Sequence, residues 1–344
     1  MNRIRKKRKL KAFNKAALIR LSILSFILLG IISWLWFTCF QMPGNSYSGK
    51  LLPLTAQEKI IQDNLQRDIN KLAVDIGARN YNNYENLNAA ADFLESSFQE
   101  SGYKVNKQEY KINNQTFTNL EIEIKGVDKP DEIVVVGGHY DTAFTTPGAN
   151  DNGSGVAAVL ELARIFADKK PSRTLRFVEF TNEEPPYFWT KKMGSLVYAK
   201  GCKQRNENII AMLSLETMGY FSKEEGSQKY PFPLNLIYPS QGNFIAFVGN
   251  IDSNKLVKKT VSYFRKQVKF PSEGLAVFNQ LPGVGWSDHW SFWQQGYQGI
   301  MVTDTAPFRY TQYHTLDDIS DNIDYEKLAR VVSGLEKVVG EFVS

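Results

Sequence analysis

After residue 56 the chain alternates between apolar runs and helical patterns, and this alternation constrains the fold most strongly. Several runs are apolar throughout, as expected for strands that are covered on both faces. The strand-like runs are 120–125, 133–137, 175–180, 209–215, 245–248 and 300–302. Helical spacing of apolar residues occupies 56–76, 86–101, 155–167, 193–200, 254–266, 289–295 and 325–343. Alternation of this kind predicts an α/β layered domain with a largely parallel, buried sheet.

An uncharged apolar run of twenty residues, 21–40, precedes this domain. A helix of that length spans about 30 Å, the thickness of the hydrocarbon core of a bilayer. Trp34, Trp36 and Phe37 lie near its far end, where aromatic rings favour the membrane interface. Residues 1–20 contain nine Lys and Arg and no acidic residue. By the positive-inside rule, the sequence predicts a basic cytoplasmic tail (1–20), one transmembrane helix (21–40) and an extracytoplasmic domain.

A cleaved signal peptide is the alternative interpretation of this segment. The apolar run is longer than the ~7–15 residues of a typical signal sequence, and it ends in bulky residues (WLWFTCF) without a small-x-small cleavage pattern. These features favour a membrane anchor. Residues 41–55 then form a linker, and 56–344 form one domain without a second linker or an internal repeat.

The distribution of charge argues against a nucleic-acid partner. Of the 41 Lys and Arg, nine lie in the tail, so 32 remain against 36 Asp and Glu, a net charge of −4. A nucleic-acid-binding domain needs a basic face, and the domain has no excess of bases to form one.

The chain has three histidines, and each lies in a polar segment next to an apolar run. His139 follows the strand-like EIVVVGG, with Asp141 two residues later. An imidazole at the carboxyl end of a strand can bind a metal, and a nearby carboxylate can fix its tautomer. Asp151 lies in the glycine-rich segment 148–155, directly before a helix. Both also have ordinary structural interpretations, as a turn histidine and as a helix-capping aspartate.

Further acids and the last histidine follow other predicted strands. Glu183 and Glu184 leave the strand TLRFVEF, so one carboxylate can bind a metal while its neighbour faces the substrate. Glu216 ends the apolar run IIAMLSL, where an unpaired charge is costly. His314 precedes an acid-rich segment. A solvated acidic loop is the structural alternative for the two glutamates. Taken together, two imidazoles and three carboxylates at strand ends are the ligand mix that two zinc ions prefer.

With these residues in place, the chain resembles the M28 family of zinc aminopeptidases and carboxypeptidases over residues 56–342. The motifs that carry the resemblance are GGHYDT, GANDNGSG, FTNEE, LETMGYF, SDHWSFW and YHTLDDI. The resemblance implies a three-layer α/β/α sandwich on a mixed, mostly parallel sheet. It implies two zinc ions, one bound by His139, Asp151 and Glu216 and the other by Asp151, Glu184 and His314. Glu183 is then the general acid/base, and Asp141 orients His139. Glu216 departs from the family pattern, in which Asp is usual.

The function implied is that of an aminopeptidase acting on peptides. The alternatives are a carboxypeptidase, a glutaminyl cyclase-like acyltransferase with one zinc, and a non-catalytic receptor or scaffold domain. Five aromatic residues are candidates for an apolar substrate pocket, although core packing would also explain them: Tyr187, Phe188, Trp189, Trp286 and Trp290. Asp288 and His289 either border the site or have a structural role, such as capping the helix that they begin. The sequence does not indicate an oligomeric state.

Overall fold

A computed structural model describes residues 15–344 and divides the chain into two compact units that meet after Gln41. In the first unit, helix α1 (Lys15–Leu35) continues into a π-helical segment, Trp36–Phe40. By length and composition this helix can cross a membrane, and a signal sequence would meet the same criteria. It contains the predicted transmembrane residues 21–40. Most of the predicted basic tail, residues 1–14, lies outside the described residues.

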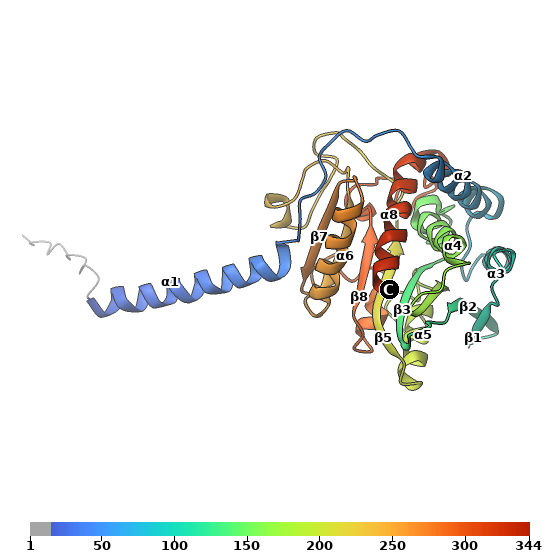
Figure 1. The fold of residues 1–344 in the computed structure, drawn as a ribbon, viewed down its shortest axis with the longest axis horizontal. Coiled ribbons are helices and arrows are strands. Elements are labelled where there is room, and N and C mark those ends of the chain that lie inside the picture. The colour runs from blue at the N-terminus through green and yellow to red at the C-terminus, as the bar shows by residue number, and fades with distance from the viewer. Residues whose placement is uncertain (1–14) are drawn as a thin grey trace, which may run out of the picture. The chain divides into compact units, whose positions relative to one another are not determined.

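The second unit, Met42–Ser344, is built on one eight-stranded mixed sheet (Figure 1). The strands are β1 (Asn106–Ile112), β2 (Gln115–Ile124), β3 (Lys129–His139), β4 (Arg173–Phe180), β5 (Asn208–Glu216), β6 (Ile245–Asn250), β7 (Ser272–Val277) and β8 (Gly299–Thr303). Their order is β1-β2-β4-β3-β5-β8-β6-β7. The central strands β4, β3, β5 and β8 run parallel, and so do β6 and β7, while β1–β2, β2–β4 and β6–β8 pair antiparallel.

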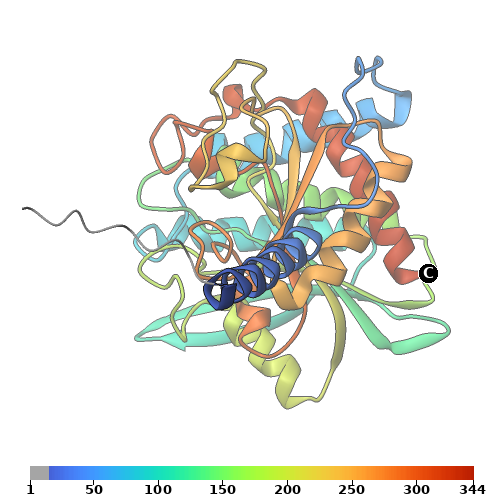
Figure 2. The same ribbon diagram turned by 90° about the vertical axis from the view of Figure 1, so that its left-hand side faces the viewer.

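Helices cover both faces of the sheet, which gives the three layers expected. One face carries α2 (Ala56–Asn70) with its π-helical extension Lys71–Ile76, α3 (Tyr84–Glu100), α4 (Gly155–Phe166), α6 (Asn254–Gln267) and α8 (Tyr325–Val343). The other carries α5 (Gly194–Gln204) and the short α7 (His289–Trp293). In Figure 2, α5 lies below the strands, with α2 and α8 above them. Short 3-10 turns occupy Leu234–Leu236, Ile251–Ser253, Ala306–Phe308 and Ser320–Asn322.

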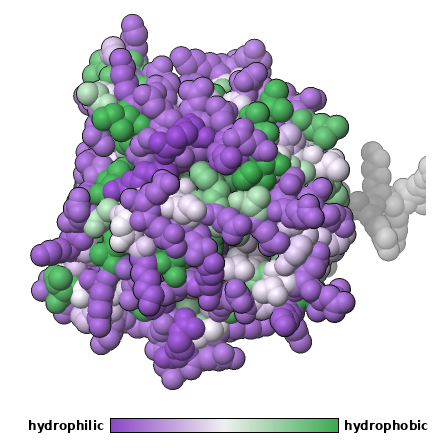
Figure 3. Space-filling view, turned by 90° about the vertical axis from the view of Figure 1, so that its right-hand side faces the viewer, coloured by the Kyte–Doolittle hydropathy of each residue, from purple (hydrophilic) through white to green (hydrophobic). Residues whose placement is uncertain are grey.

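The alternation of side chains along β3 shows why the strand is apolar throughout. Val134 and Val136 pack with the helices of the α4 face, whereas Ile133 and Val135 pack with those of the α5 face. Both sides of the strand are therefore core, as the continuous apolar runs predict. The exterior is different: the face in Figure 3 is mostly hydrophilic with small hydrophobic patches, as expected for a surface in water.

Residues 42–46, at the start of the predicted linker, are bound to the domain. The Arg265 guanidinium donates through Nη1 to the carbonyls of Pro43 (3.2 Å) and Gly44 (3.0 Å). The backbone N–H of Ser272, at the start of β7, donates to Ser46 Oγ at 2.9 Å. The first residues after Gln41 therefore lie against the edge strand β7.

Candidate metal centre

The carboxyl ends of parallel strands carry most of the predicted site residues. His139 and Glu216 are the last residues of β3 and β5, and Glu183 and Glu184 follow the end of β4 by three and four residues. Because β3 lies between β4 and β5 and runs parallel to both, these ends meet at one edge of the sheet. Asp151 comes from the turn before α4, and His314 from the loop after β8.

Two groups of three side chains that share Asp151 converge there, and a third, overlapping group consists of His139, Glu183 and Glu184. In the first, His139 Nε2 lies 3.5 Å from Asp151 Oδ1 and 3.2 Å from Glu216 Oε2. In the second, His314 Nε2 lies 2.9 Å from Asp151 Oδ2 and 3.1 Å from Glu184 Oε1. Within each group the potential ligand atoms all lie within 4.8 Å of one another. Asp151 thus offers one oxygen to each of the two groups that share it.

The electrostatics of the site favour a cation. Four of the five members of the two groups that share Asp151 are buried and His314 is half-buried. Burial, followed by the Asp151 charge, raises the pKa of Glu184 to about 7, and burial also raises the pKa of Glu216. Burial opposes a negative charge on Asp151 as well, but the two imidazoles outweigh it and lower the Asp151 pKa. Carboxylates at this density are costly unless positive charge compensates them.

The unpaired atoms of the second group fit a divalent metal. Asp151 Oδ2, Glu184 Oε1 and His314 Nε2 are buried, face one another and have no hydrogen-bond partner. Imidazole nitrogen and carboxylate oxygen are the donors that zinc accepts alongside thiolate. The first group has the same chemistry, and Ser287 Oγ donates to Glu216 Oε2 at 2.7 Å, which holds that carboxylate in place.

Glu183 and Asp141 lie beside the two groups. Glu183 Oε2 is 4.0 Å from His139 Nε2, and burial raises the pKa of the Glu183 carboxyl well above its ordinary value. Asp141 accepts hydrogen bonds from the backbone N–H groups of Glu183 (3.0 Å) and Glu184 (3.1 Å), one on each oxygen. Its carboxylate is 3.5 Å from His139 Nδ1, while the Asp141 backbone carbonyl is nearer, at 3.1 Å. Asp141 therefore fixes the backbone of both glutamates as well as facing the His139 ring.

Arg79 supports the site and was not singled out from the sequence. Its fully buried guanidinium donates to five backbone carbonyls, those of Leu72, Gly77, Tyr140, Pro147 and Gly148. The last three lie in the segment between His139 and Asp151. One side chain thus holds the loop that connects two candidate ligands. No pattern around Arg79 indicates this role, because all its partners are backbone atoms.

Asn152 also ties ligand-bearing segments together. Its side-chain amide donates to the Leu215 carbonyl at 2.9 Å, and its Oδ1 accepts from the Thr217 N–H at 3.0 Å. These bonds lie on either side of Glu216, so the Asp151 turn is joined to the end of β5. Asn152 stands in the glycine-rich motif, which was the only sequence signal for it.

The chain bends sharply near several of the candidate ligands. Asn182, Thr217 and His314 adopt left-handed backbone conformations, with φ of 58°, 41° and 60°. Non-glycine residues rarely adopt such angles, which cost about 1–3 kcal/mol each and gather at functional sites. The ring of Tyr313 stacks on His314 with centroids 3.8 Å apart, and Phe144 meets His314 edge-on. Packing therefore holds this strained residue.

One of the five aromatic residues lines a pocket, and the other four pack against aromatic neighbours. Tyr187 packs against Tyr81 and Phe117, and Phe188 and Trp189 stack on each other beside Trp290. Of the five predicted residues, Trp286 alone lines the pocket described below. The aromatic spacing in the sequence did not distinguish a core contact from a pocket wall.

Asp288 and His289 begin α7, but Asp288 makes no side-chain capping hydrogen bond, so the expected capping role is wrong. Asp288 is fully buried, and burial raises its pKa to about 7. His289 Nε2 contacts the Val284 carbonyl at 2.8 Å, and its ring meets Trp293 edge-on. His289 is therefore a structural residue, packed away from the two ligand groups.

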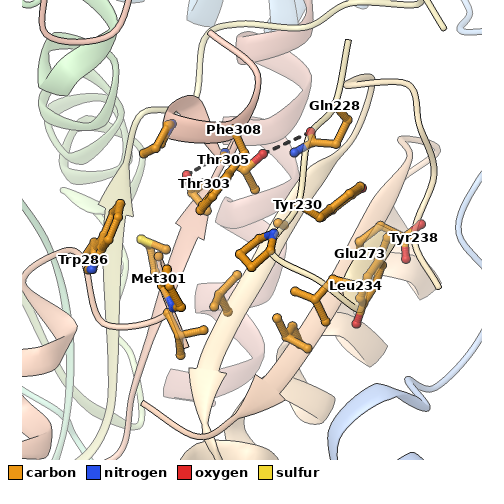
Figure 4. Close-up of a pocket in the computed structure, with 18 of the residues that line it drawn as sticks. Gln228, Tyr230, Leu234, Tyr238, Glu273, Trp286, Met301, Thr303, Thr305 and Phe308 are labelled. Atoms are coloured by element: carbon orange, nitrogen blue, oxygen red, sulfur yellow. Dashed lines mark hydrogen bonds between the residues drawn. The ribbon is translucent and has the colours of Figure 1, made fainter. Parts of the chain in front are cut away.

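A largely apolar pocket opens beside Glu216 and extends over β8, β6 and β7 (Figure 4). It encloses about 770 Å³ of empty space, part of which is open to solvent. Glu216 and Tyr313 place its near end at the candidate metal centre. A side chain that projects from the centre can therefore enter it.

The fold and the clustered imidazoles and carboxylates together indicate a metallopeptidase. The model of peptidase family M28 matches residues 119–339, and the chain belongs to that family. The Escherichia coli (strain K12) protein YfbL is 34% identical to this chain, over 79% of this chain and 86% of its own length. A probable zinc metalloprotease of Pyrenophora tritici-repentis is 26% identical, over 79% of this chain and 70% of its own.

Solved structures show the same fold at low sequence identity. BSAP, a zinc aminopeptidase from Bacillus subtilis, matches 86% of this chain and 97% of its own with a TM-score of 0.67 and 17% identity. A glutaminyl cyclase from Fimbriiglobus ruber matches 86% of this chain and 97% of its own with a TM-score of 0.61 and 21% identity. The fold therefore does not by itself separate these two chemistries.

Proposed function

We propose that this chain is a two-zinc aminopeptidase that removes single residues from the N-terminus of peptides. One observation carries the proposal: two three-residue ligand groups share Asp151, and the carboxyl of Glu183 lies beside them. In this proposal His139, Asp151 and Glu216 hold one ion, and Asp151, Glu184 and His314 hold the other. The match to a zinc peptidase family supports the choice of metal.

When bound, the zinc ions would polarise the substrate carbonyl and lower the pKa of a water molecule towards about 7. Glu183 does the proton chemistry. Its carboxylate accepts the proton of the attacking water at Oε2 and then passes it to the nitrogen of the leaving amine.

Asp141 positions this base. Its two oxygens accept from the N–H groups of Glu183 and Glu184, so both carboxylates leave a backbone that cannot rotate freely. A general base has to be within about 3 Å of the proton it takes, and such a constraint keeps it there. The pocket beside Glu216 then accepts the side chain of the first substrate residue.

We further propose that α1 anchors the chain in a membrane, with residues 1–20 in the cytoplasm and the domain on the opposite side. The basic residues ahead of the apolar run support this orientation. Peptides outside the cytoplasm are then the substrates.

The test is a panel of chromogenic aminoacyl substrates, assayed with and without a chelator, together with a count of zinc per chain. We expect chelator-sensitive release of the first residue and two zinc ions. The glutaminyl cyclase alternative predicts one zinc and ring closure of a glutamine-leading peptide. A carboxypeptidase would cleave only substrates with a free C-terminus, and a receptor or scaffold domain would cleave none.

A further inference from the structure

The floor of the pocket is a row of four residues that crosses the sheet. Glu216 pairs with Thr303, Thr303 with Ala246, and Ala246 with Glu273. Directly paired residues point to the same face of a sheet, and all four line the pocket. The row therefore carries a carboxylate at each end, one at the candidate metal centre and one on β7. Three inter-strand steps of about 4.8 Å separate them, roughly 14 Å in all.

The far end of the pocket combines this second carboxylate with aromatic rings. Tyr230 and Tyr238 stack with ring centroids 5.9 Å apart, and Figure 4 shows Tyr238 beside Glu273. The hydroxyls of the two tyrosines donate to the carbonyls of Pro239 and Gly274, both at 2.7 Å, so the rings rather than the hydroxyls are offered to a ligand. Aromatic faces and a carboxylate together favour a cation.

The polar side chains in the middle of the pocket are engaged with the protein. Gln228 Oε1 accepts from Arg309 Nε (2.8 Å) and Thr305 Oγ1 (3.1 Å), and Gln228 Nε2 donates to the Lys229 carbonyl. Thr303 Oγ1 lies 3.0 Å from Thr217 Oγ1. The charged residues among those that line the pocket are Glu216 and Glu273, and no base is among them. The lining therefore has negative charge and a largely apolar wall.

Arg265 only partly compensates the negative charge of Glu273. Its Nη2 is 3.6 Å from Glu273 Oε2, which is longer than a hydrogen bond. Instead the guanidinium donates to Ser272 and to the carbonyls of Pro43 and Gly44. Ser46 also interacts with the Glu273 side chain, which stays about 20% exposed. The Glu273 carboxylate can therefore still bind a further cation.

From this geometry we propose that the pocket selects substrates whose first residue is arginine or lysine, with Glu273 as the specificity-determining residue. The inference rests on the proposed aminopeptidase function. The apolar walls contact the methylene groups, and the guanidinium or ammonium group reaches Glu273 beside the tyrosine rings. A leucine or methionine side chain is held by the walls but carries no charge to the far end.

The test compares substrates that differ mainly in the charge of the side chain. The full-length protein, loaded with zinc, is assayed with the p-nitroanilides of arginine and its neutral isostere citrulline, and of lysine and norleucine. We expect kcat/KM for arginine to exceed that for citrulline by about tenfold or more, the size of one moderate charge interaction. Glu273→Gln should bring this ratio towards one through a loss of kcat/KM for arginine.

A second pair of variants keeps the test independent of the folding of Glu273→Gln. Tyr238→Leu should lower the preference for arginine, whereas Tyr238→Phe, which keeps the ring, should retain it. The proposal is overturned if the wild-type protein cleaves citrulline as efficiently as arginine, or if Glu273→Gln leaves the ratio unchanged. If the norleucine substrate is still cleaved well, only the specificity proposal fails and the proposed aminopeptidase function stands. If no substrate is cleaved in a chelator-sensitive way, both the specificity proposal and the proposed aminopeptidase function are overturned.

Discussion

The Asp318 carboxylate accepts a hydrogen bond from the backbone N–H of Asp151, 167 residues earlier in the chain, at 3.0 Å. Its other oxygen accepts from the Asn150 N–H at 2.8 Å and from the Tyr310 hydroxyl at 3.0 Å. Asp318 lies four residues after His314. One buried carboxylate therefore joins the loops that carry two of the three candidate ligands of the second metal group.

Asp318→Asn should weaken this junction, because an amide NH₂ would have to face an N–H donor. Leaving a buried donor unpaired costs about 1–3 kcal/mol. We expect a loss of that size in the free energy of unfolding measured with urea, and weaker retention of zinc on dialysis against a chelator. Asp317→Asn, at the exposed neighbouring position, is the matched control. If the two variants have the same free energy of unfolding and retain zinc equally well, Asp318 does not join the two loops.

Glu183→Gln should keep the fold and the zinc content but lose turnover. The amide cannot accept the proton of the attacking water, and general acid–base catalysis contributes about 10²- to 10⁴-fold. We expect kcat to fall by that factor with little change in KM. Zinc content and thermal unfolding, measured on the same preparation, check that the metal groups are intact. Near-wild-type turnover would exclude Glu183 as the base.

The sequence predicted the fold well where a strand is covered on both faces. The apolar runs of β3, β4, β5, β6 and β8 and the second half of β2 were found. The edge strands β1 and β7 were missed. β1 has the sequence NKQEYKI and is largely exposed, so it lacks the continuous apolar run that identifies a central strand. β7 is short, and the polar SEG begins it.

The site could be predicted only in part, for a physical reason. His139, Asp151, Glu184 and Glu216 stand at or near strand and helix ends and His314 lies in a loop, all within recognisable motifs, and the structure brings the five together. Their roles as zinc ligands stay predictions. Arg79 and Asp318 act on backbone atoms far away in the sequence, which no local pattern encodes. The pocket row likewise depends on the register between strands, so Glu273 was invisible in the sequence.

If the two proposed metal groups each hold a zinc ion, the two ions should leave the protein at different rates. The His314 side chain is 25% exposed, whereas that of His139 is 1% exposed. A chelator should therefore reach the group of Asp151, Glu184 and His314 first. We expect biphasic zinc release, followed with a metal-sensitive dye. His314→Ala should remove the fast phase and leave about one zinc per chain, while His139→Ala should remove the slow phase. A single release phase with one zinc would argue for the one-metal alternative.

His289 should make stability fall with decreasing pH. Burial of the imidazole lowers its pKa to about 4 from the ordinary 6.5, because the buried ring cannot easily take up a charge. Between these two values the unfolded chain binds a proton that the folded chain does not, so lowering the pH favours unfolding. The contribution of the neutral His289 to the free energy of unfolding is full above pH 6.5 and decreases as the pH falls towards 4. From pH 7.5 to pH 5 the loss should be about 2 kcal/mol.

His289→Gln isolates this contribution, since the amide can still donate to the Val284 carbonyl but does not titrate. Both proteins are freed of metal and unfolded with urea at pH 7.5 and pH 5, so that the other titrating groups cancel in the difference. The wild-type protein should lose about 2 kcal/mol more than the variant on acidification. If the two proteins lose the same free energy of unfolding, the buried His289 is not held neutral, and its place in the core beside Trp293 would have to be reconsidered.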